Sequence, residues 1–339
     1  MKQRSVKRTA AIIAVVVVAA LAGFGAWNYK TARKTYSGAP GSIVLGGVVN
    51  DANVVFFTAE DRHFLAENGI DFTFKTYDTG LASLAELLNH KIDIAGASEY
   101  PIVAKAFQKA NISIIASIDK SYVIYFVGLT DRGIRNVANI KGKKIGLPRG
   151  SIAEFYLGRF LSLNGMNIRD VTLINLPWEH AVGAMAHGSV DAVVTEEPYV
   201  SQIQKQHPQG TVRWSVHSSQ GIYIVLVCRN DWIKQHPDQV ERVLNSFAQA
   251  EGYIVQHPTE AKAILRKRYR YDDGYMARVW PEHQFSLSLD QSLVVALEDE
   301  ARWMIGNHLT TEKQVPDFLN YIYEDGLKAI RPDAVSIIR

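Results

Sequence analysis

Two segments of this 339-residue chain, about a hundred positions apart, repeat one pattern of secondary structure. They are LASLAELLNHKIDIAGASEYP (81–101) and WEHAVGAMAHGSVDAVVTEEPY (178–199). Each starts with apolar residues at the i, i+3, i+4 and i+7 spacing of a helix, followed by a turn and a short apolar strand. A duplicated strand–helix–strand unit predicts two similar lobes, with a cleft between them. The turns carry His90 and His187, the strands are entered through Asp93 and Asp191, and Glu99 and Glu197 follow; Gly188 accounts for a one-residue difference in register.

The length and composition agree with two lobes. A chain of 339 residues usually exceeds one hydrophobic core, and 47% hydrophobic with 21% charged residues is typical of a globular protein. The net charge of +3 includes several charges in the first eight residues, so we expect no nucleic-acid partner. The single cysteine, Cys228, lies in the apolar run GIYIVLVC, which predicts a buried thiol outside any intramolecular disulfide.

The N-terminal segment (1–30) predicts an export signal or a membrane anchor. Four basic residues precede an uncharged apolar run from Ala10 to Trp27. Ala20-Leu21-Ala22 would suit a signal peptidase, whereas an uncleaved run of this length would reach the lower limit for spanning a bilayer. Residues 31–41 read as a linker. Either alternative places the rest of the chain outside the cytoplasm.

Strands and helices alternate after the linker, which predicts parallel βαβ units. We expect lobe 1 to comprise residues 42–125, lobe 2 residues 126–220, and residues 221–339 to return to lobe 1. Long apolar runs near 121–129 and 212–230 predict the two crossovers. From Trp232 onward the pattern is mostly helical with breaks at prolines, and these helices should pack on lobe 1. The expected strands are 42–49, 71–77, 92–96, 112–118, 143–148, 171–176 and 190–194; the expected helices are 81–89, 101–110, 152–163 and 178–187.

Ligands of such sheets bind beyond the carboxyl ends of the strands, where helices begin. The segment GLPRGS (146–151) is suited to an anion, because a helix N-terminus carries partial positive charge. Ser151 could instead only cap its own helix, and Arg149 could be a solvated loop residue. The residues expected at the cleft are Asn50, Thr79, Gly80, Ser98, Glu99, Tyr100, Arg149, Gly150, Ser151, Trp178, Glu196 and Glu197.

The glutamates favour a different ligand. If Glu99 and Glu197 faced the cleft they would suit a cation, an amine or a hydroxyl donor. The alternative is that each only stabilises the first turn of its own helix. Trp178 could stack on a ligand, or it could pack in the core as part of its helix's apolar stripe.

Three second-lobe motifs in order, IKGKKIGLPRGSIAEFYLGRFL (140–161), VTLINLP (171–177) and SVDAVVTEEPYVSQ (189–202), resemble the substrate-binding proteins of bacterial ABC importers. The resemblance extends from Ser42 to Gln256 and is to the group that binds aliphatic sulfonates, taurine, nitrate or thiamine pyrimidines. It implies two Rossmann-like α/β lobes joined by two crossover strands, the type II periplasmic binding protein fold, closing on a small polar molecule by a hinge. It also implies ABC permease and ATPase subunits as partners of a monomeric protein. At Glu196 the group often has an aromatic residue, so this chain adds negative charge beside the expected pocket.

Two other classes compete with a binding protein. An uncleaved N-terminal segment would also suit a membrane-anchored sensor that uses the same cleft. A pyrimidine-synthesising enzyme would need a cysteine-rich motif, and the chain has one cysteine. It also lacks the His-Glu-x-x-His, Gly-x-Ser-x-Gly and P-loop motifs, and His180 and His187 have no carboxylate pair to form a metal site with. We therefore predict a non-catalytic protein without cofactor or metal.

Overall fold

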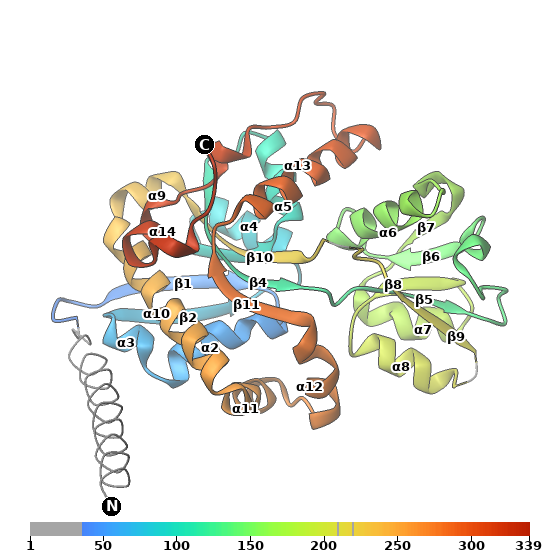
Figure 1. Ribbon diagram of the computed structural model, residues 1–339, viewed down its shortest axis with the longest axis horizontal. Helices are drawn as coiled ribbons and strands as arrows, with labels where there is room; N and C mark the ends of the chain where they lie inside the picture. The colour runs from blue at the N-terminus through green and yellow to red at the C-terminus, as the bar shows by residue number, and fades with distance from the viewer. Residues whose placement is uncertain (1–35, 209, 219) are drawn as a thin grey trace, which may run out of the picture.

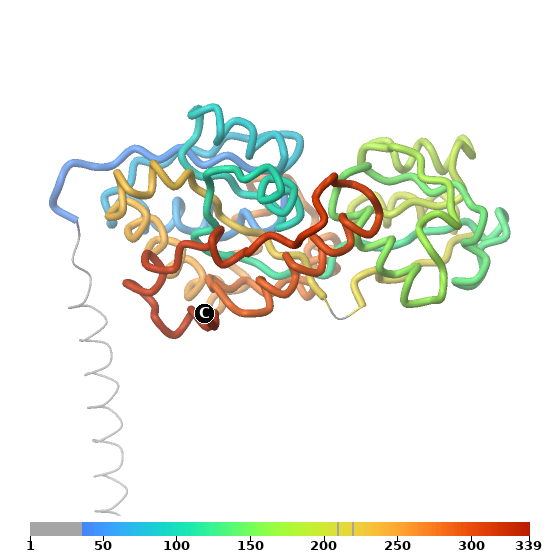
Figure 2. The backbone as a smooth tube through the Cα atoms, turned by 90° about the horizontal axis from the view of Figure 1, so that it is seen from above, coloured from blue at the N-terminus to red at the C-terminus, as the bar shows by residue number. Residues whose placement is uncertain are grey.

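The computed structural model describes residues 36–208, 210–218 and 220–339. They form two α/β lobes that meet at a waist (Figure 1, Figure 2). The expected signal or anchor (1–30) lies outside the described residues, as do residues 31–35 of the expected linker. None of the helices in the described part of the chain is both long enough and apolar enough to cross a membrane.

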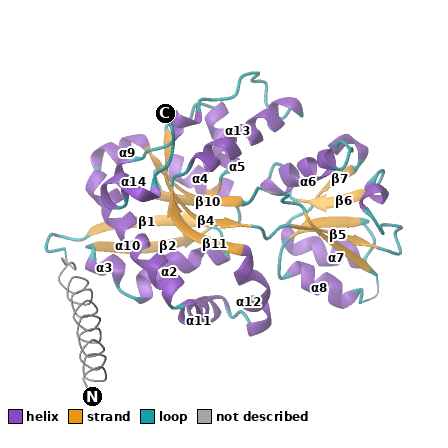
Figure 3. Cartoon of the chain, viewed as in Figure 1, coloured by secondary structure: helices purple, strands orange, loops and turns teal. Residues whose placement is uncertain are grey.

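Lobe 1 is built on a six-stranded sheet in the order β11-β4-β10-β3-β1-β2. Its central strands are buried, as expected for a sheet with helices on both faces (Figure 3). β1 runs parallel to β2 and β3, whereas β10 is antiparallel to β3 and β4. The strands are β1 (Gly41–Gly47), β2 (Ile70–Thr76), β3 (Ile94–Ser98), β4 (Ile112–Ser121), β10 (Ile222–Arg229) and β11 (His283–Ser288).

Lobe 2 is built on a five-stranded sheet in the order β7-β6-β8-β5-β9. Again three strands are parallel, while β5 is antiparallel to β8 and β9. The predicted parallel βαβ units are present, and the antiparallel strands within these sheets were not predicted. Each lobe receives one strand from a crossover, and that strand enters the sheet in the opposite direction. The strands are β5 (Tyr125–Leu129), β6 (Lys144–Leu147), β7 (Thr172–Asn175), β8 (Ala192–Thr195) and β9 (Thr211–Ser215).

The sequence repeat corresponds to a repeat of topology. The order β2-β1-β3-β10-β4 in lobe 1 matches β7-β6-β8-β5-β9 in lobe 2. The repeated aspartates make the same bond in both lobes. Asp93 Oδ2 accepts a hydrogen bond from the Val44 backbone N–H at 2.8 Å, and Asp191 Oδ2 accepts one from Lys144 N–H at 2.8 Å. Asp93 thus ties the start of β3 to β1, and Asp191 ties the start of β8 to β6.

The two histidines of the repeat are not equivalent. His90 adopts a left-handed conformation with φ of 59°, and the residue at the same distance before the second aspartate is Gly188, with φ of 67°. His187 is instead the C-cap of the preceding helix, with φ of −82°. Between the turn and the aspartate the copies are therefore in the same register, and the prediction that Gly188 accounts for an extra residue is wrong. A left-handed residue ends each helix, and glycine accommodates it without a steric penalty.

Most of the described helices belong to lobe 1, and the C-terminal ones pack on it as predicted. Pro237 and Pro258 begin helices, where a missing N–H costs nothing. β11 was not predicted, because its alternation is short and lies within a helical pattern. The lobe 1 helices are α2 (Val54–Asp61), α3 (Phe64–Glu67), α4 (Gly80–Leu88), α5 (Tyr100–Phe107), α9 (Asn230–Gln235), α10 (Pro237–Gln256), α11 (Pro258–Tyr269), α12 (Asp273–Val279), α13 (Gln291–Gly306) and α14 (Asp325–Ile330).

Lobe 2 contains α6 (Ile152–Leu163), α7 (Ala181–Ala186) and α8 (Tyr199–Gln206) among its described residues. Along β5 the side chains alternate between two cores. Tyr125, Val127 and Leu129 pack with residues of α7 and α8, whereas Phe126 belongs to the larger core that continues into lobe 1. The lobes therefore share apolar packing on one side of the waist. Short 3-10 helices are η1 (Asp51–Asn53), η2 (Val137–Ile140), η3 (Ile168–Asp170), η4 (Trp178–His180), η5 (Trp280–Glu282), η6 (Phe318–Tyr321) and η7 (Pro332–Ala334).

Two connections cross between the lobes. The first joins β4 to β5 through residues 122–124, and the second joins β9 to β10 through residues 216–221. The expected lobe boundaries at 125/126 and 220/221 fall at or beside these connections. The two crossovers connect to β4 and β10, which are neighbours in the lobe 1 sheet. The connections therefore lie close together, and the two lobes meet at a narrow waist.

Candidate ligand site at the lobe junction

One side of the lobe junction is closed by aromatic packing. The Phe155 ring of α6 lies 5.6 Å from Trp303 of α13 and 6.2 Å from Tyr100 of α5. Gly158 permits this approach, because a Cβ there would lie 2.6 Å from Trp303 Nε1. Arg159 of α6 also forms an ion pair with Asp299 of α13. α13 therefore fastens lobe 2 to lobe 1 on this side.

A pair of buried carboxyls lies beside this packing. Glu99 precedes α5, Glu300 lies on α13, and neither is exposed. Glu99 Oε2 accepts a hydrogen bond from Tyr223 N–H at 3.1 Å, while neither oxygen of Glu300 has a donor partner among the described residues. Burial raises the pKa of Glu99; burial, followed by the charge of Glu99, raises the pKa of Glu300. The pair therefore keeps a proton at neutral pH.

The opposite side of the junction is polar. His283 of β11 binds Asp119 of β4 through Nδ1, with 2.7 Å between Nδ1 and Oδ2. Its other nitrogen, Nε2, lies 3.6 Å from Asp51 Oδ2. Burial alone would lower the pKa of His283, but the charge and hydrogen bond of Asp119, with Asp51, raise it to about 10. His283 is therefore an imidazolium held between two carboxylates.

Tyrosines from the end of α11 and from α12 line the same side. Tyr275 Oη donates a hydrogen bond to Asp51 Oδ2 at 2.9 Å. The Tyr271 ring stacks on Tyr275 with 4.1 Å between centroids, and Tyr269 accepts a hydrogen bond from Asn53 Nδ2 at 2.7 Å. Burial raises the pKa of all three phenols, so they remain neutral. They offer flat aromatic faces next to a carboxylate.

Lobe 2 contributes two adjacent glutamates after β8. Glu196 is only partly exposed, yet no described residue makes a hydrogen bond or ion pair to its carboxylate. Burial and then the charge of Asp51 raise the pKa of Glu196 to about 7, against the lowering effect of His283. Glu197 accepts hydrogen bonds from Ser201, and its Oε1 lies 3.4 Å from Arg278 Nε on α12. Glu197 thus links the lobes, and Glu196 faces lobe 1 unpaired.

Acceptors without donors collect at this junction. Asp51 is 7% exposed and its Oδ1 has no partner among the described residues; the buried Oδ1 of Asn50 has none either. Most buried polar atoms in proteins are paired, so such a concentration indicates a place for a ligand. Two grooves of about 560 and 410 Å³ lie on other faces of lobe 1. None of the described residues that line them has an unpartnered buried polar side-chain atom.

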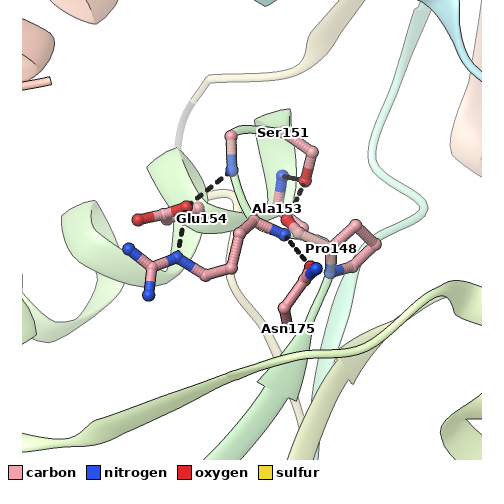
Figure 4. A network of polar contacts seen from close by, with 7 residues as sticks. Pro148, Ser151, Ala153, Glu154 and Asn175 are labelled. Atoms are coloured by element: carbon pink, nitrogen blue, oxygen red, sulfur yellow. Dashed lines mark hydrogen bonds and ion pairs between the residues drawn. The ribbon is translucent and has the colours of Figure 1, made fainter.

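The expected anion site at the start of α6 is already occupied by a side chain of the protein (Figure 4). Ser151 Oγ caps the helix by accepting from Ala153 N–H at 3.2 Å. Glu154 Oε2 accepts from Gly150 N–H at 2.8 Å and from Arg149 Nε at 3.0 Å. Glu154 is 3% exposed and lies near enough to Tyr100 for its charge to affect that phenol.

The remaining expected residues lie in separate surroundings. Thr79 is exposed and caps α4 by accepting from Ala82 N–H at 3.0 Å. Gly80 allows α4 to approach β3, because a Cβ there would lie 2.9 Å from the Ala97 Cβ. Ser98 ends β3, and Trp178 packs partly buried against the core. The structure brings Asn50 and Glu196 to the polar side of the junction, and Tyr100 with the Arg149–Ser151 segment to the aromatic side.

Several junction residues were not predicted. Asp119, His283 and the tyrosines meet only through tertiary contacts, although the spacing Tyr269, Tyr271 and Tyr275 was visible in the sequence. Glu154 could have been found, since Ser151-Ile-Ala-Glu154 has the spacing of a capping box. Within the described residues no group of three or more His, Cys, Asp or Glu side chains could hold a metal ion.

Comparisons with known proteins agree with this architecture. The family described as NMT1/THI5 like matches residues 50–261. A putative aliphatic sulfonates-binding protein of Bacillus subtilis is 28% identical over 258 residues, covering 74% of this chain and 75% of that protein. The 4-amino-5-hydroxymethyl-2-methylpyrimidine phosphate synthase THI12 of Saccharomyces cerevisiae is 22% identical over 227 residues, covering 62% and 65%. The periplasmic aliphatic sulphonate binding protein SsuA from Escherichia coli has the same fold, with a TM-score of 0.70, 18% identity, and coverage of 84% of this chain and 98% of that one.

Proposed function

The chain belongs to the NMT1/THI5-like family, and from this premise we propose that it is an extracytoplasmic solute-binding protein of an ABC importer. It captures a small polar organic molecule between its two lobes. The proposal rests on one observation: the buried Oδ1 of Asp51 in lobe 1 has no donor, and the partly exposed carboxylate of Glu196 in lobe 2, which lies near enough to sense the charge of Asp51, has no partner among the described residues. A molecule bound there would contact both lobes, and so would favour the arrangement in which they are close together.

The site is proposed to bind rather than to catalyse. A relative in the same family is a pyrimidine phosphate synthase, so the fold alone does not separate the two roles. Enzymes of that kind are expected to use a cysteine-rich motif. The one cysteine of this chain, Cys228, is buried in β10, and burial raises the pKa of its thiol well above the usual range. That thiol is not positioned to act as a nucleophile.

The relatives' names support the proposed location and partners. A taurine-binding periplasmic protein of Escherichia coli and the aliphatic sulphonate binding protein support a place in the periplasm or on the outer face of the inner membrane. The partners would then be the permease and ATPase subunits of the importer, with this chain as a monomer. A membrane-anchored sensor would use the same site. Mass spectrometry of the N-terminus of the exported protein separates a cleaved signal from an anchor.

The proposal is tested by the thermal unfolding of the purified full chain in the presence of small molecules. A ligand at a hundred times its Kd stabilises the folded state by about 2.7 kcal/mol. For a folded unit of about 300 residues, that corresponds to a rise in Tm of roughly 4 °C. The screen should contain sulfonates, amino-sulfonates, amines, aminopyrimidines and, as a control, neutral sugars. A Tm that stays constant across the whole screen would refute the proposal.

A further inference from the structure

The polar contacts at the start of α6 already satisfy the groups that would bind an anion. The backbone N–H of Gly150 and the guanidinium of Arg149 both donate to Glu154 Oε2, at 2.8 and 3.0 Å (Figure 4). The Ser151 hydroxyl is also engaged, since it donates to the Pro148 carbonyl at 2.6 Å and accepts from Ala153 N–H. A buried carboxylate of the protein therefore occupies the position that a sulfonate would need.

Displacing Glu154 would be unfavourable. Its side chain is 5% exposed, so an incoming anion would leave a desolvated carboxylate without its donors. Arg149 itself is about half exposed and could follow the ligand, but it would then abandon Glu154. The α6 terminus consequently disfavours a ligand whose only charged group is an anion.

The other side of the junction has the opposite deficit. Asn50 Oδ1 and Asp51 Oδ1 are buried acceptors without donors, and Glu196 faces them from lobe 2 without a partner among the described residues. His283 does not supply the missing donor, because its Nδ1 binds Asp119 at 2.7 Å and its Nε2 is 3.6 Å from the other oxygen of Asp51. These acceptors need several hydrogen-bond donors, and because two of them are carboxylates, donors that carry positive charge are favoured.

The surrounding side chains suit a planar nitrogen group. Tyr271 lies close enough to feel the charges of both Asp51 and Glu196, and it stacks on Tyr275. Aromatic faces beside carboxylates bind cations and N–H-bearing rings by cation–π and stacking contacts. Tyr275 already donates its hydroxyl hydrogen to Asp51, so it orients that carboxylate without satisfying Oδ1.

We propose that the three carboxylates select the charge of the ligand: Asp51 and Glu196 bind a cationic or N–H-rich nitrogen group, and Glu154 excludes ligands that carry only an anion. This inference rests on the proposed solute-binding function and specifies the class of solute. A zwitterion is accepted through its ammonium group, and a simple alkanesulfonate is rejected.

The test uses three probes with one carbon skeleton: ethanolamine, 2-aminoethanesulfonate and ethanesulfonate, together with 4-aminopyrimidine and unsubstituted pyrimidine. Binding to the full chain is measured by calorimetry and thermal shift at pH 8. We expect ethanolamine and 2-aminoethanesulfonate each to bind at least tenfold more tightly than ethanesulfonate, and 4-aminopyrimidine to bind at least tenfold more tightly than pyrimidine. E196Q and D51N should each reduce that affinity tenfold or more, while E86Q, which removes a carboxylate on α4 away from the junction, should not.

A complementary variant tests exclusion at α6. In E154Q the amide keeps a hydrogen-bond acceptor for Gly150 and removes the charge, so the variant should fold, and ethanesulfonate should bind at least fivefold more tightly than it does to the unmodified chain. Circular dichroism checks the fold. Equal binding of ethanesulfonate and 2-aminoethanesulfonate to the unmodified chain would overturn the inference and leave the proposed function standing. An ethanesulfonate affinity unchanged by E154Q would overturn the role of Glu154, and failure of every compound in the wider screen would overturn both proposals.

Discussion

The imidazole Nε2 of His217 accepts a hydrogen bond from the backbone N–H of Ile124 at 2.9 Å. Ile124 lies in the first crossover and His217 in the second, so this bond joins the two connections between the lobes. The ring is buried, with Tyr156 of α6 at 4.5 Å and Tyr122 at 5.6 Å between ring centroids. The His217 side chain thereby holds the two crossovers close together between the lobes.

His217 should make stability sensitive to acid. Burial lowers its pKa to about 4, below the 6.5 of an unfolded chain. The unfolded state therefore binds more protons between these values, and the stability contributed by neutral His217 is lost as pH falls from 6.5 through 4. H217Q keeps a hydrogen-bond acceptor but cannot be protonated. When the free energy of unfolding is measured with urea, its decrease from pH 7 to pH 4 should be smaller in H217Q than in the unmodified chain by up to about 3 kcal/mol. Parallel curves for the two proteins would contradict the prediction.

The Glu99–Glu300 pair should act in the opposite direction. Burial raises the pKa of Glu99, and burial with the charge of Glu99 raises the pKa of Glu300, so the folded state holds more protons than the unfolded one. Stability then decreases as pH rises above about 4.5, by about 1.4 kcal/mol per pH unit for each proton retained. E300Q should reduce that slope between pH 5 and 7. E298Q is the control, since Glu298 is on the same helix but pairs at the surface with Arg302; equal slopes for both variants would argue against a shared proton.

Removing His283 should destabilise the fold. H283Q leaves the fully buried Asp119 without its counter-charge, which typically costs about 3–5 kcal/mol. D119N combined with H283Q should recover part of this loss, because Asp119 then carries no charge and only Asp51 is left without the imidazolium. Chemical unfolding at pH 7 measures both variants. The account would be contradicted if the double variant lost more free energy of unfolding than H283Q and D119N lose in total.

The Arg278–Glu197 pair should favour close approach of the lobes. Arg278 is half exposed, so the pair is expected to contribute only about 0.5–1 kcal/mol. In R278A we expect the radius of gyration from small-angle X-ray scattering to increase without ligand, and ligand affinity to fall two- to fivefold. R266A removes an ion pair within lobe 1, to Asp273, and should leave the radius unchanged. If the unmodified chain, R278A and R266A gave identical scattering, the Arg278–Glu197 pair would not determine how closely the lobes approach.

Binding of a cationic ligand should strengthen with pH. Burial and the charge of Asp51 raise the pKa of Glu196 to about 7, and the other titratable groups that face it are His283, Tyr271 and Tyr199. Below pH 7 Glu196 must lose a proton before it can pair with a cation, so affinity should fall about tenfold per pH unit. Calorimetry with ethanolamine, which stays cationic from pH 5.5 to 8, measures the released proton when it is repeated in two buffers. E196Q should abolish the dependence, and a pH profile unchanged in E196Q would assign it to another group.

Much of the architecture was predictable because it depends on local patterns. The helix and strand periodicities of residues 81–101 and 178–199 identified a duplicated unit, and the position of α6 was predicted to the residue. The strand directions were not, because the crossovers insert β10 and β5 antiparallel to their neighbours. The direction of each strand depends on where the chain re-enters the sheet, and hydrophobic periodicity contains no information about that position.

The sequence by itself determined the two lobes, the strand-initiating aspartates Asp93 and Asp191, and a junction rich in carboxylates. Those features follow from side-chain periodicity and hydrogen bonds that recur in each copy. Only the tertiary structure decided which carboxylates are satisfied. Glu197 is paired with Ser201 and Arg278, whereas Asp51 Oδ1 has no donor and the Glu196 carboxylate has no partner among the described residues. Satisfaction of a buried charge depends on donors contributed from distant segments, as when His283 reaches Asp119 across 164 positions, and the folded chain alone brings them together.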